Sequence, residues 1–306
     1  MEHGWHSGAK RPLAIAGAVV LAYFGVEIAG ALISGSLALL ADAAHTVSDV
    51  GALGLAYAAA WIAGRPQSAS HSFGLLRAEI LSALVNGAAL LVIATFIFIE
   101  AVQRFASPPE VKGGIVSLVA SGGLVANLVA GWILMKASRE SLNARSALFH
   151  VAGDAIGSAG AIVAGLAVML FGWRLADPVV SVLIGLILVY GAVRVVRAAT
   201  HILLEGTPTH IDVAELRRDI EALPMVAGVH DLHTWTITSG YEALSAHITI
   251  RDECEGAQVG ALRGALGKVM RDKYNISHLT IQLERTAGEC EEEVHVPSLD
   301  SREAPR

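Results

Sequence analysis

Two short stretches of the sequence carry the same pair of metal-binding side chains at the same spacing. His45 precedes Asp49 by four residues, and His150 precedes Asp154 by four residues. Both stretches are apolar and have the pattern of helices, in which residues four apart lie on one face, one turn from each other. Two such faces can supply two imidazole nitrogens and two carboxylate oxygens. That set suits a tetrahedral divalent metal, zinc above all.

The apolar setting of these pairs favours a transport pathway. Ionisable groups at membrane depth are costly and by default mark such a pathway, although polar side chains also bond neighbouring membrane helices. One pair would leave both interpretations open, and the repeat of order and spacing on two helices favours a metal site. Asp42 lies one turn before His45, where it would support the ligands from behind or lie near the entrance to the site.

The composition predicts a membrane protein for most of its length. Of the 306 residues, 54% are hydrophobic and only 16% are charged, whereas soluble domains carry about 25% charged residues. The net charge of −6 does not suggest nucleic-acid binding. The two cysteines, Cys254 and Cys290, lie in the polar C-terminal third, so no disulfide framework is expected.

Six apolar stretches are long enough to cross a bilayer as helices, which takes about 20 residues each. They cover residues 13–33, 37–63, 75–105, 111–135, 146–171 and 178–199. Lys and Arg gather before the first stretch, between the second and third, between the fourth and fifth, and after the sixth. The positive-inside rule then places both termini in the cytoplasm. An Ala/Gly-rich chain without targeting signals suits a bacterial inner (plasma) membrane.

Past residue 205 the chain becomes polar. Helical and strand patterns follow in the order helix, strand, strand, helix, strand, over residues 212–223, 229–238, 244–251, 257–274 and 277–284. This order predicts a small α+β domain. The expected division is an N-terminal segment, a six-helix transmembrane domain, a C-terminal domain and a disordered acidic tail, over residues 1–11, 12–205, 206–286 and 287–306.

The chain resembles the cation diffusion facilitators, in the branch linked to efflux of zinc, cadmium and cobalt. The resemblance rests on SGSLALLADAAHTVSDV, RPQSASHSFGLLRAEIL, SALFHVAGDAIGS, DPVVSVLIGLILV and GVHDLHTWTITSGYEALSAHI with HLTIQLE, and covers about residues 12 to 285. It implies a homodimer with six helices per subunit and a ferredoxin-like cytoplasmic domain. It also implies export of divalent metal from the cytoplasm in exchange for protons, by alternating access. His45, Asp49, His150 and Asp154 match the family's transport site.

The ligand types bear on which metal is carried. Imidazole favours zinc, cobalt, nickel or copper over manganese, which prefers oxygen ligands. The two-His, two-Asp set resembles that of zinc-selective members, and cadmium and cobalt stay plausible. Some members bind a second metal in the loop between helices two and three through one Asp and two His, of which only His71 is present here. That loop site is expected to be absent or very weak, with His71 in a structural role.

In the C-terminal domain, His230, His247 and Glu284 match the family's cytoplasmic zinc site, where zinc would be structural or regulatory. Strand alternation supports part of this, because His247 and Glu284 face away from the apolar side of their strands. His278 shares that face, and His233 is a weaker candidate that would pack or hydrogen-bond. Polar residues on a half-exposed sheet are the alternative explanation.

Other residues near the membrane boundary have less specific patterns. Arg77 and Glu205 are expected to pair across the dimer or the hinge, and so to couple metal binding in the C-terminal domain to helix movement. His3, His6 and Cys290 are candidates for collecting metal at the cytoplasmic surface, but solvated tails are the favoured explanation.

The favoured function is a zinc/proton antiporter in a lipid bilayer. Metal binding needs neutral imidazole and ionised carboxylate, so metal and protons compete for one site. A membrane metalloenzyme would keep three protein ligands and an open position on zinc, and no HExxH motif is present, so an enzyme is not expected. A membrane metal sensor that binds without transporting, and a passive channel, are the remaining alternatives. A sensor needs no ligands at bilayer depth, and a channel lacks proton coupling.

Overall fold

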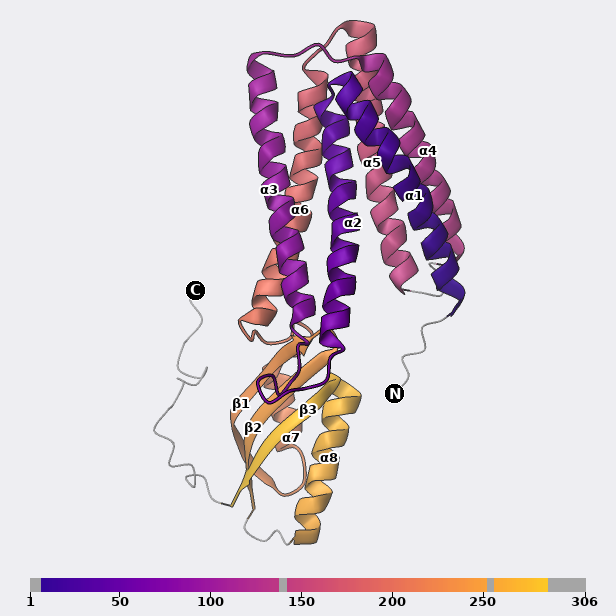
Figure 1. The fold of residues 1–306 in the computed structure, drawn as a ribbon. Helices are drawn as coiled ribbons and strands as arrows, with labels where there is room; N and C mark the ends of the chain where they lie inside the picture. Colours follow the sequence, from indigo (N-terminus) through magenta and orange to yellow (C-terminus); the bar gives the residue numbers. More distant parts are fainter. Residues whose placement is uncertain (1–6, 138–141, 252–255, 286–306) are drawn as a thin grey trace. The chain divides into compact units, whose positions relative to one another are not determined.

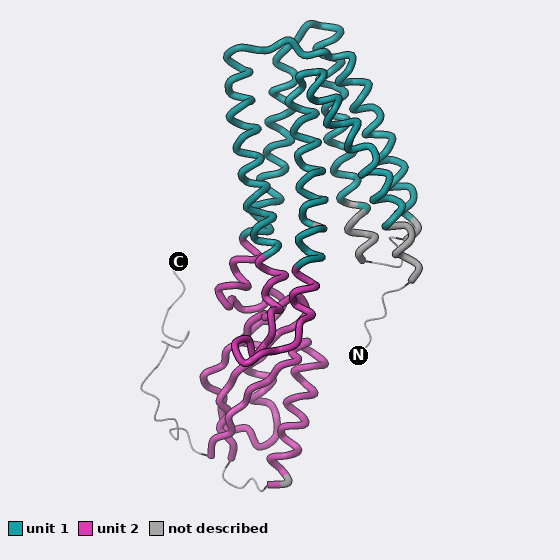
Figure 2. The backbone as a smooth tube through the Cα atoms, in the orientation of Figure 1, with its two compact units in different colours: residues 1–58, 82–196 teal, residues 59–81, 197–306 magenta. Residues whose placement is uncertain are grey.

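The described part of the chain contains six long helices, two shorter helices and a three-stranded sheet (Figure 1). The computed structural model describes residues 7–137, 142–251 and 256–285. The chain separates into two units (Figure 2): unit 1 comprises residues 1–58 and 82–196, and unit 2 comprises residues 59–81 and 197–306.

The long helices are α1 Ser7–Ser34, α2 Leu37–Ala63, α3 Ala78–Ala106, α4 Gly113–Ala137, α5 Leu142–Phe171 and α6 Ala176–Leu203. All six are long and apolar enough to cross a membrane, which confirms the predicted spans. Some helices extend past the apolar stretches, since α1 begins six residues earlier than predicted and α5 four residues earlier. Lys10 and Arg145 lie in these extensions. Lys and Arg are good helix formers, so the helix continues where the apolar pattern ends.

Large apolar side chains cover the outside of the helices. Phe96, Leu118, Trp132 and Phe171 are all exposed on the surface of unit 1. A bilayer accommodates such a surface, and a helix satisfies its own backbone hydrogen bonds there. The chain is therefore an integral membrane protein.

Close packing holds α5 against α4 and α4 against α1, which lie side by side (Figure 1). A Cβ atom added at Gly30 of α1 would lie 2.7 Å from Val119 Cγ2 of α4. Small residues at such contacts let membrane helices approach closely. The helix that carries His150 and Asp154 is thus fixed within this group of three helices.

Asp177, near the start of α6, fixes the start of α2. Its carboxylate accepts hydrogen bonds from the backbone N–H groups of Leu37 (2.8 Å) and Ala38 (3.3 Å) and from the Ser36 hydroxyl (2.5 Å). Arg104 of α3 lies 3.5 Å from the same carboxylate. Since the first N–H groups of a helix have no partner within it, an acidic side chain there stabilises the helix start. Asp177 therefore ties α2 to α3 and α6.

Unit 2 is built on a sheet in the order β1–β2–β3, with strands β1 Val226–Thr238, β2 Tyr241–Ile250 and β3 Ile276–Glu284. β1 and β2 are antiparallel, and β2 and β3 are parallel. Two helices, α7 Val213–Glu221 and α8 Gly256–Tyr274, pack with the strands in one core, which includes Leu216, Ile220, Leu244, Ile248, Leu262 and Leu266. The predicted element order and the α+β class are confirmed.

The polar residues of the sheet lie opposite this core. Leu244 and Ile248 of β2 belong to the core, so His247 between them points to the other face. β1 is irregular between His230 and His233, where Asp231 has a left-handed φ of 50°. Such a bulge redirects side chains next to it, and here it lies beside the polar face.

The link between α2 and α3 belongs to unit 2 and is anchored on the sheet. Glu79, in the first turn of α3, accepts hydrogen bonds from the hydroxyls of Thr238 (2.6 Å) and Ser239 (2.9 Å). The ring of Phe73 lies against His278 of β3, with ring centroids 5.2 Å apart. These contacts fix the link at the β1–β2 turn and at the start of β3.

Candidate metal sites

Four side chains from α2 and α5 converge in unit 1. His150 Nε2 lies 3.1 Å from Asp49 Oδ2 and 3.7 Å from Asp154 Oδ2. His45 Nε2 lies 3.5 Å from Asp154 Oδ1, and its Nδ1 lies 3.7 Å from Asp49 Oδ2. One ligand atom from each of His45, Asp49 and His150 lies within 4.8 Å of the other two. The structure thus brings together the two His–Asp pairs singled out by their spacing.

The chemistry of this group fits a divalent metal as the bound substrate. His45 Nδ1 is buried and has no hydrogen-bond partner among the described residues, although buried polar atoms nearly always have one. The side chain of Asp154 is 14% exposed and that of His150 is 46% exposed, so the group is buried on one side and open on the other. Two imidazoles and two carboxylates can complete a tetrahedral shell around zinc.

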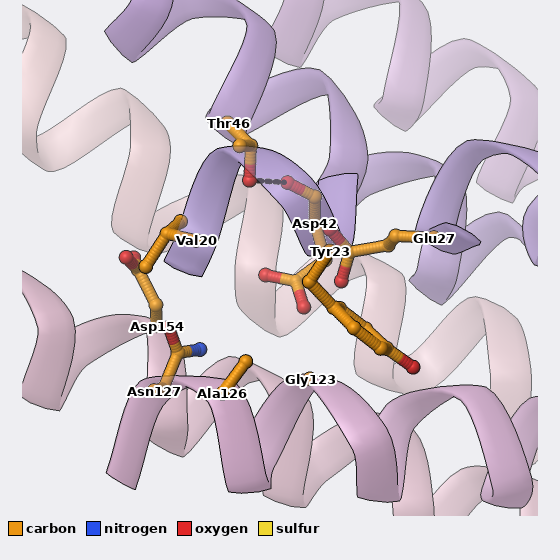
Figure 3. Close-up of a pocket in the computed structure, with 9 residues that line it drawn as sticks. All are labelled: Val20, Tyr23, Glu27, Asp42, Thr46, Gly123, Ala126, Asn127 and Asp154. Carbon is orange, nitrogen blue, oxygen red and sulfur yellow. Dashed lines mark hydrogen bonds between the residues drawn. The ribbon is translucent and has the colours of Figure 1, made fainter. Parts of the chain in front are cut away.

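A small cavity of about 20 Å³ lies beside this group (Figure 3), lined by Val20, Tyr23, Glu27, Asp42, Thr46, Gly123, Ala126, Asn127 and Asp154. Its volume suits a single water molecule. Asp42 lines this cavity and does not belong to the group of candidate ligands found among the described residues. Its carboxylate accepts a hydrogen bond of 3.3 Å from the Ser158 hydroxyl. Asp42 thus lies at the cavity beside the ligands, and its supporting role stays a prediction.

A second group lies on the polar face of the sheet in unit 2, where one ligand atom from each of His230, His247 and Glu284 lies within 4.8 Å of the others. Glu284 Oε1 lies 2.9 Å from His247 Nδ1, and Glu284 Oε2 lies 3.2 Å from His230 Nε2. The Gln282 amide donates a hydrogen bond of 3.1 Å to Glu284 Oε1. Glu284 is only 2% exposed, and its Oε2 makes no hydrogen bond of good geometry within the described chain. A buried carboxylate with an unsatisfied oxygen between two imidazoles fits a divalent cation.

His233 and Asp231 lie at the edge of this second group. His233 Nε2 is 2.8 Å from Asp231 Oδ1, and Asp231 Oδ2 is 3.8 Å from His247 Nε2. The sequence analysis did not single out Asp231. The signal for it is the run His230-Asp231-Leu232-His233, but the bulge that turns its carboxylate toward His247 is not visible in a local pattern.

Two other histidines lie apart from both groups. The ring of His278 contacts those of Phe73 and Tyr241, with centroids 5.2 and 6.4 Å away. His71 is exposed, and its Nδ1 lies 3.1 Å from the Ser70 hydroxyl. Neither belongs to a metal-binding group among the residues that the structure describes.

Arg77 and Glu205 form an ion pair of 3.1 Å within unit 2 of a single chain. Glu205 has a left-handed φ of 59° just after α6 ends. Exposed pairs of this kind contribute little to stability. His3, His6 and Cys290 lie outside the described residues.

Comparison with known proteins gives matches over nearly the whole chain. The family model described as "Cation efflux transmembrane domain" matches residues 13–204, and "Cation efflux protein, cytoplasmic domain" matches residues 208–286. The chain is 38% identical to the "Cadmium, cobalt and zinc/H(+)-K(+) antiporter" of Bacillus subtilis, over 94% of this chain and 93% of that protein. It is 39% identical to "Zinc transporter ZitB" of Escherichia coli, over 90% and 87% of the two chains.

Two further matches come from Cupriavidus metallidurans. The "Metal cation efflux system protein CzcD" is 36% identical over 92% of this chain and 89% of that protein. A solved structure, the metal-bound C-terminal domain of the CzcD transporter, is 38% identical and covers 24% of this chain and 99% of its own, with a TM-score of 0.22.

Proposed function

We propose that this protein exports zinc from the cytoplasm in exchange for protons. The chain belongs to the cation efflux family, the cation diffusion facilitators, in the branch of zinc, cadmium and cobalt. It is therefore a metal transporter and not an enzyme. The transport site consists of His45, Asp49, His150 and Asp154. The observation that carries this assignment is the convergence of the two pairs, with 3.1 Å between His150 Nε2 and Asp49 Oδ2 and 3.5 Å between His45 Nε2 and Asp154 Oδ1.

Proton exchange follows from the ligand types. Zinc binds neutral imidazoles and ionised carboxylates, so its arrival expels the protons that these groups hold. Protons that enter from the opposite side of the membrane then compete with zinc and favour its release. Because each pair lies on its own helix, a change in the separation of α2 and α5 exposes the site to one side and weakens it at the same time.

Zinc is the proposed substrate, with cadmium and cobalt as further candidates. Two imidazole ligands favour zinc and cobalt over the hard cations, and relatives are named for zinc, cadmium and cobalt. The protein resides in a bacterial inner (plasma) membrane with both termini in the cytoplasm. Basic residues at the α2–α3 link and around the α4–α5 link support this orientation: Arg65, Arg77, Lys136, Arg139 and Arg145.

The second group, His230, His247 and Glu284, holds a resident zinc ion in the C-terminal domain, residues 206–286. Glu284 contributes the carboxylate, the two histidines contribute imidazole nitrogens, and Gln282 orients the carboxylate through its hydrogen bond. The bound ion compensates the buried charge of Glu284 and so stabilises the polar face of the sheet. His233 lies at the edge of this site.

The protein works as a homodimer. Membership of the cation diffusion facilitators, through a match to their cytoplasmic domain over residues 208–286, supports this proposal. Arg77 and Glu205 connect the α2–α3 link to the end of α6, and this pair couples zinc binding in the C-terminal domain to movement of the helices.

Zinc flux into proteoliposomes across an imposed pH gradient tests the transport function. Flux that depends on the gradient and is lost in both Asp49→Ala and Asp154→Ala supports the antiporter and its site together. Asp272→Ala, an exposed carboxylate on α8, is the matched control and should retain flux. Zinc binding without flux would favour the sensor, and flux indifferent to the gradient would favour the channel.

A further inference from the structure

Asp42 and Ser158 join the two helices that carry the proposed ligands. The Ser158 hydroxyl of α5 donates a hydrogen bond of 3.3 Å to Asp42 Oδ2 of α2. Asp42 is 6% exposed and Ser158 is 0% exposed, so the bond is shielded from bulk water. We refer to this contact as the α2–α5 clamp.

The clamp lies one helical turn from the ligands on each helix. Asp42 precedes His45 by three residues, and Ser158 follows Asp154 by four. A helix turn takes 3.6 residues, so each clamp residue lies next to a ligand on the same face of its helix. The distance between α2 and α5 at the clamp therefore largely sets the distance between His45 and Asp154.

The close approach of α5 leaves Asp42 little room to adjust on the side of Gly157. A Cβ atom added at Gly157 would lie 3.1 Å from Asp42 Oδ1, closer than an ordinary van der Waals contact. Glu27 of α1 lines the same small cavity as Asp42, and Figure 3 shows both carboxyl groups there. Interiors packed in this way are not continuously deformable.

We propose that the α2–α5 clamp sets the spacing of the ligand pairs and makes the site selective for ions of the size of zinc over the larger cadmium ion. This inference rests on the proposed transport site. Asp42, Gly157 and Ser158 are positioning residues, since they act through the separation of the two helices. A larger ion needs longer ligand bonds and thus more widely spaced pairs, and the clamp opposes that movement.

Two substitutions that widen the clamp by different means test the proposal. Ser158→Ala removes the hydrogen bond, and Gly157→Ala inserts a methyl group against Asp42. The full-length protein in proteoliposomes is assayed for kcat/KM with Zn²⁺, Co²⁺ and Cd²⁺ under one pH gradient. Both variants should raise the cadmium-to-zinc ratio about threefold to tenfold, the range expected for loss of one hydrogen bond.

Cobalt is the internal control for ion size, because the radius of Co²⁺ is close to that of Zn²⁺. The cobalt-to-zinc ratio should therefore stay at the native value in both variants. Two matched variants should leave both ratios unchanged. They are Ser121→Ala, whose hydroxyl donates to the Ser117 carbonyl within α4, and Gly17→Ala, where an added Cβ atom would meet no described atom within 4 Å.

Unchanged cadmium-to-zinc ratios in both clamp variants would overturn the proposal, as would equal losses for all three metals. For a variant that no longer transports, the dissociation constants for Cd²⁺ and Zn²⁺ are measured by calorimetry in detergent. A gain in cadmium affinity relative to zinc supports the proposal, and an unchanged ratio overturns it. Failure of the transport site is a separate result, because Asp49→Ala and Asp154→Ala would then retain flux.

Discussion

Replacement of Asp177 by alanine should destabilise unit 1 severely, through loss of the start of α2. The carboxylate is 1% exposed and accepts hydrogen bonds from Leu37, Ala38 and Ser36. Alanine leaves these donors without a partner and leaves Arg104 with only its bonds to Glu100 and the Gly35 carbonyl.

The magnitude follows from these contacts. Loss of a helix N-cap costs about 1 kcal/mol, and removal of one partner from a buried ion pair costs about 3–5 kcal/mol. Because Arg104 keeps its other bonds, we expect a total loss of about 3–5 kcal/mol in the free energy of unfolding. Asp177→Asn keeps a capping oxygen and removes only the charge, so its loss should be about 1–2 kcal/mol.

The free energy of unfolding in mixed micelles, measured by titration with a denaturing detergent, provides the assay. Glu110→Ala is the control, since Glu110 pairs with Arg174 in an exposed ion pair of 2.9 Å that should contribute less than about 1 kcal/mol. The reasoning is refuted if Asp177→Ala costs no more than Glu110→Ala, or if the asparagine and alanine variants are equally unstable.

Three further predictions concern unit 2. With zinc at about 100 times its dissociation constant, the native C-terminal site should add about 2.7 kcal/mol to stability, and Glu284→Gln should abolish most of this gain in thermal scans with and without zinc. Hydrogen bonds from Lys273 and Tyr274 hold the pKa of Asp219 below its ordinary value of 3.8. The contribution of Asp219 to stability is therefore complete above pH 3.8 and disappears as the pH falls through the pKa of the folded state. Asp219→Asn should flatten this pH dependence of the free energy of unfolding in acid, and an unchanged pH profile would contradict the prediction. Reversal of either charge of the Arg77–Glu205 pair should weaken the change in transport rate that zinc binding in the C-terminal domain produces. Reversal of both charges together should restore that change. Failure of the double variant to restore it would count against coupling through the pair.

Local sequence patterns were enough to predict the helices and strands and the convergence of the proposed ligands. Apolar length predicted the six helices, because a bilayer imposes a minimum span on each. The spacing of His45 from Asp49, and of His150 from Asp154, placed each pair on one helical face, because residues four apart always share a face. Because both faces are polar and both helices are otherwise apolar, the two faces were expected to meet.

Contacts between distant segments were beyond this reasoning. Asp177 has the local pattern of an acidic residue at the start of its own helix, yet its carboxylate bonds the start of α2, 140 residues earlier. Ser158 has the pattern of an ordinary small residue in a membrane helix, and its partner Asp42 lies 116 residues away. Glu79 is bonded by Thr238 and Ser239 of the C-terminal domain, although the apolar pattern assigns it to a transmembrane span. No periodicity encodes such pairings, since each depends on which helices and strands become neighbours.

Division of the proposed ligands between α2 and α5 also has a consequence during biosynthesis. Asp49 and Asp154 are separated by 105 residues, which a ribosome takes about 5–20 s to add at ordinary rates. During that interval the nascent chain offers a single His–Asp pair, which holds zinc far less tightly than four ligands do. On the proposed assignment, tight zinc binding at this site therefore begins only once α5 has been made.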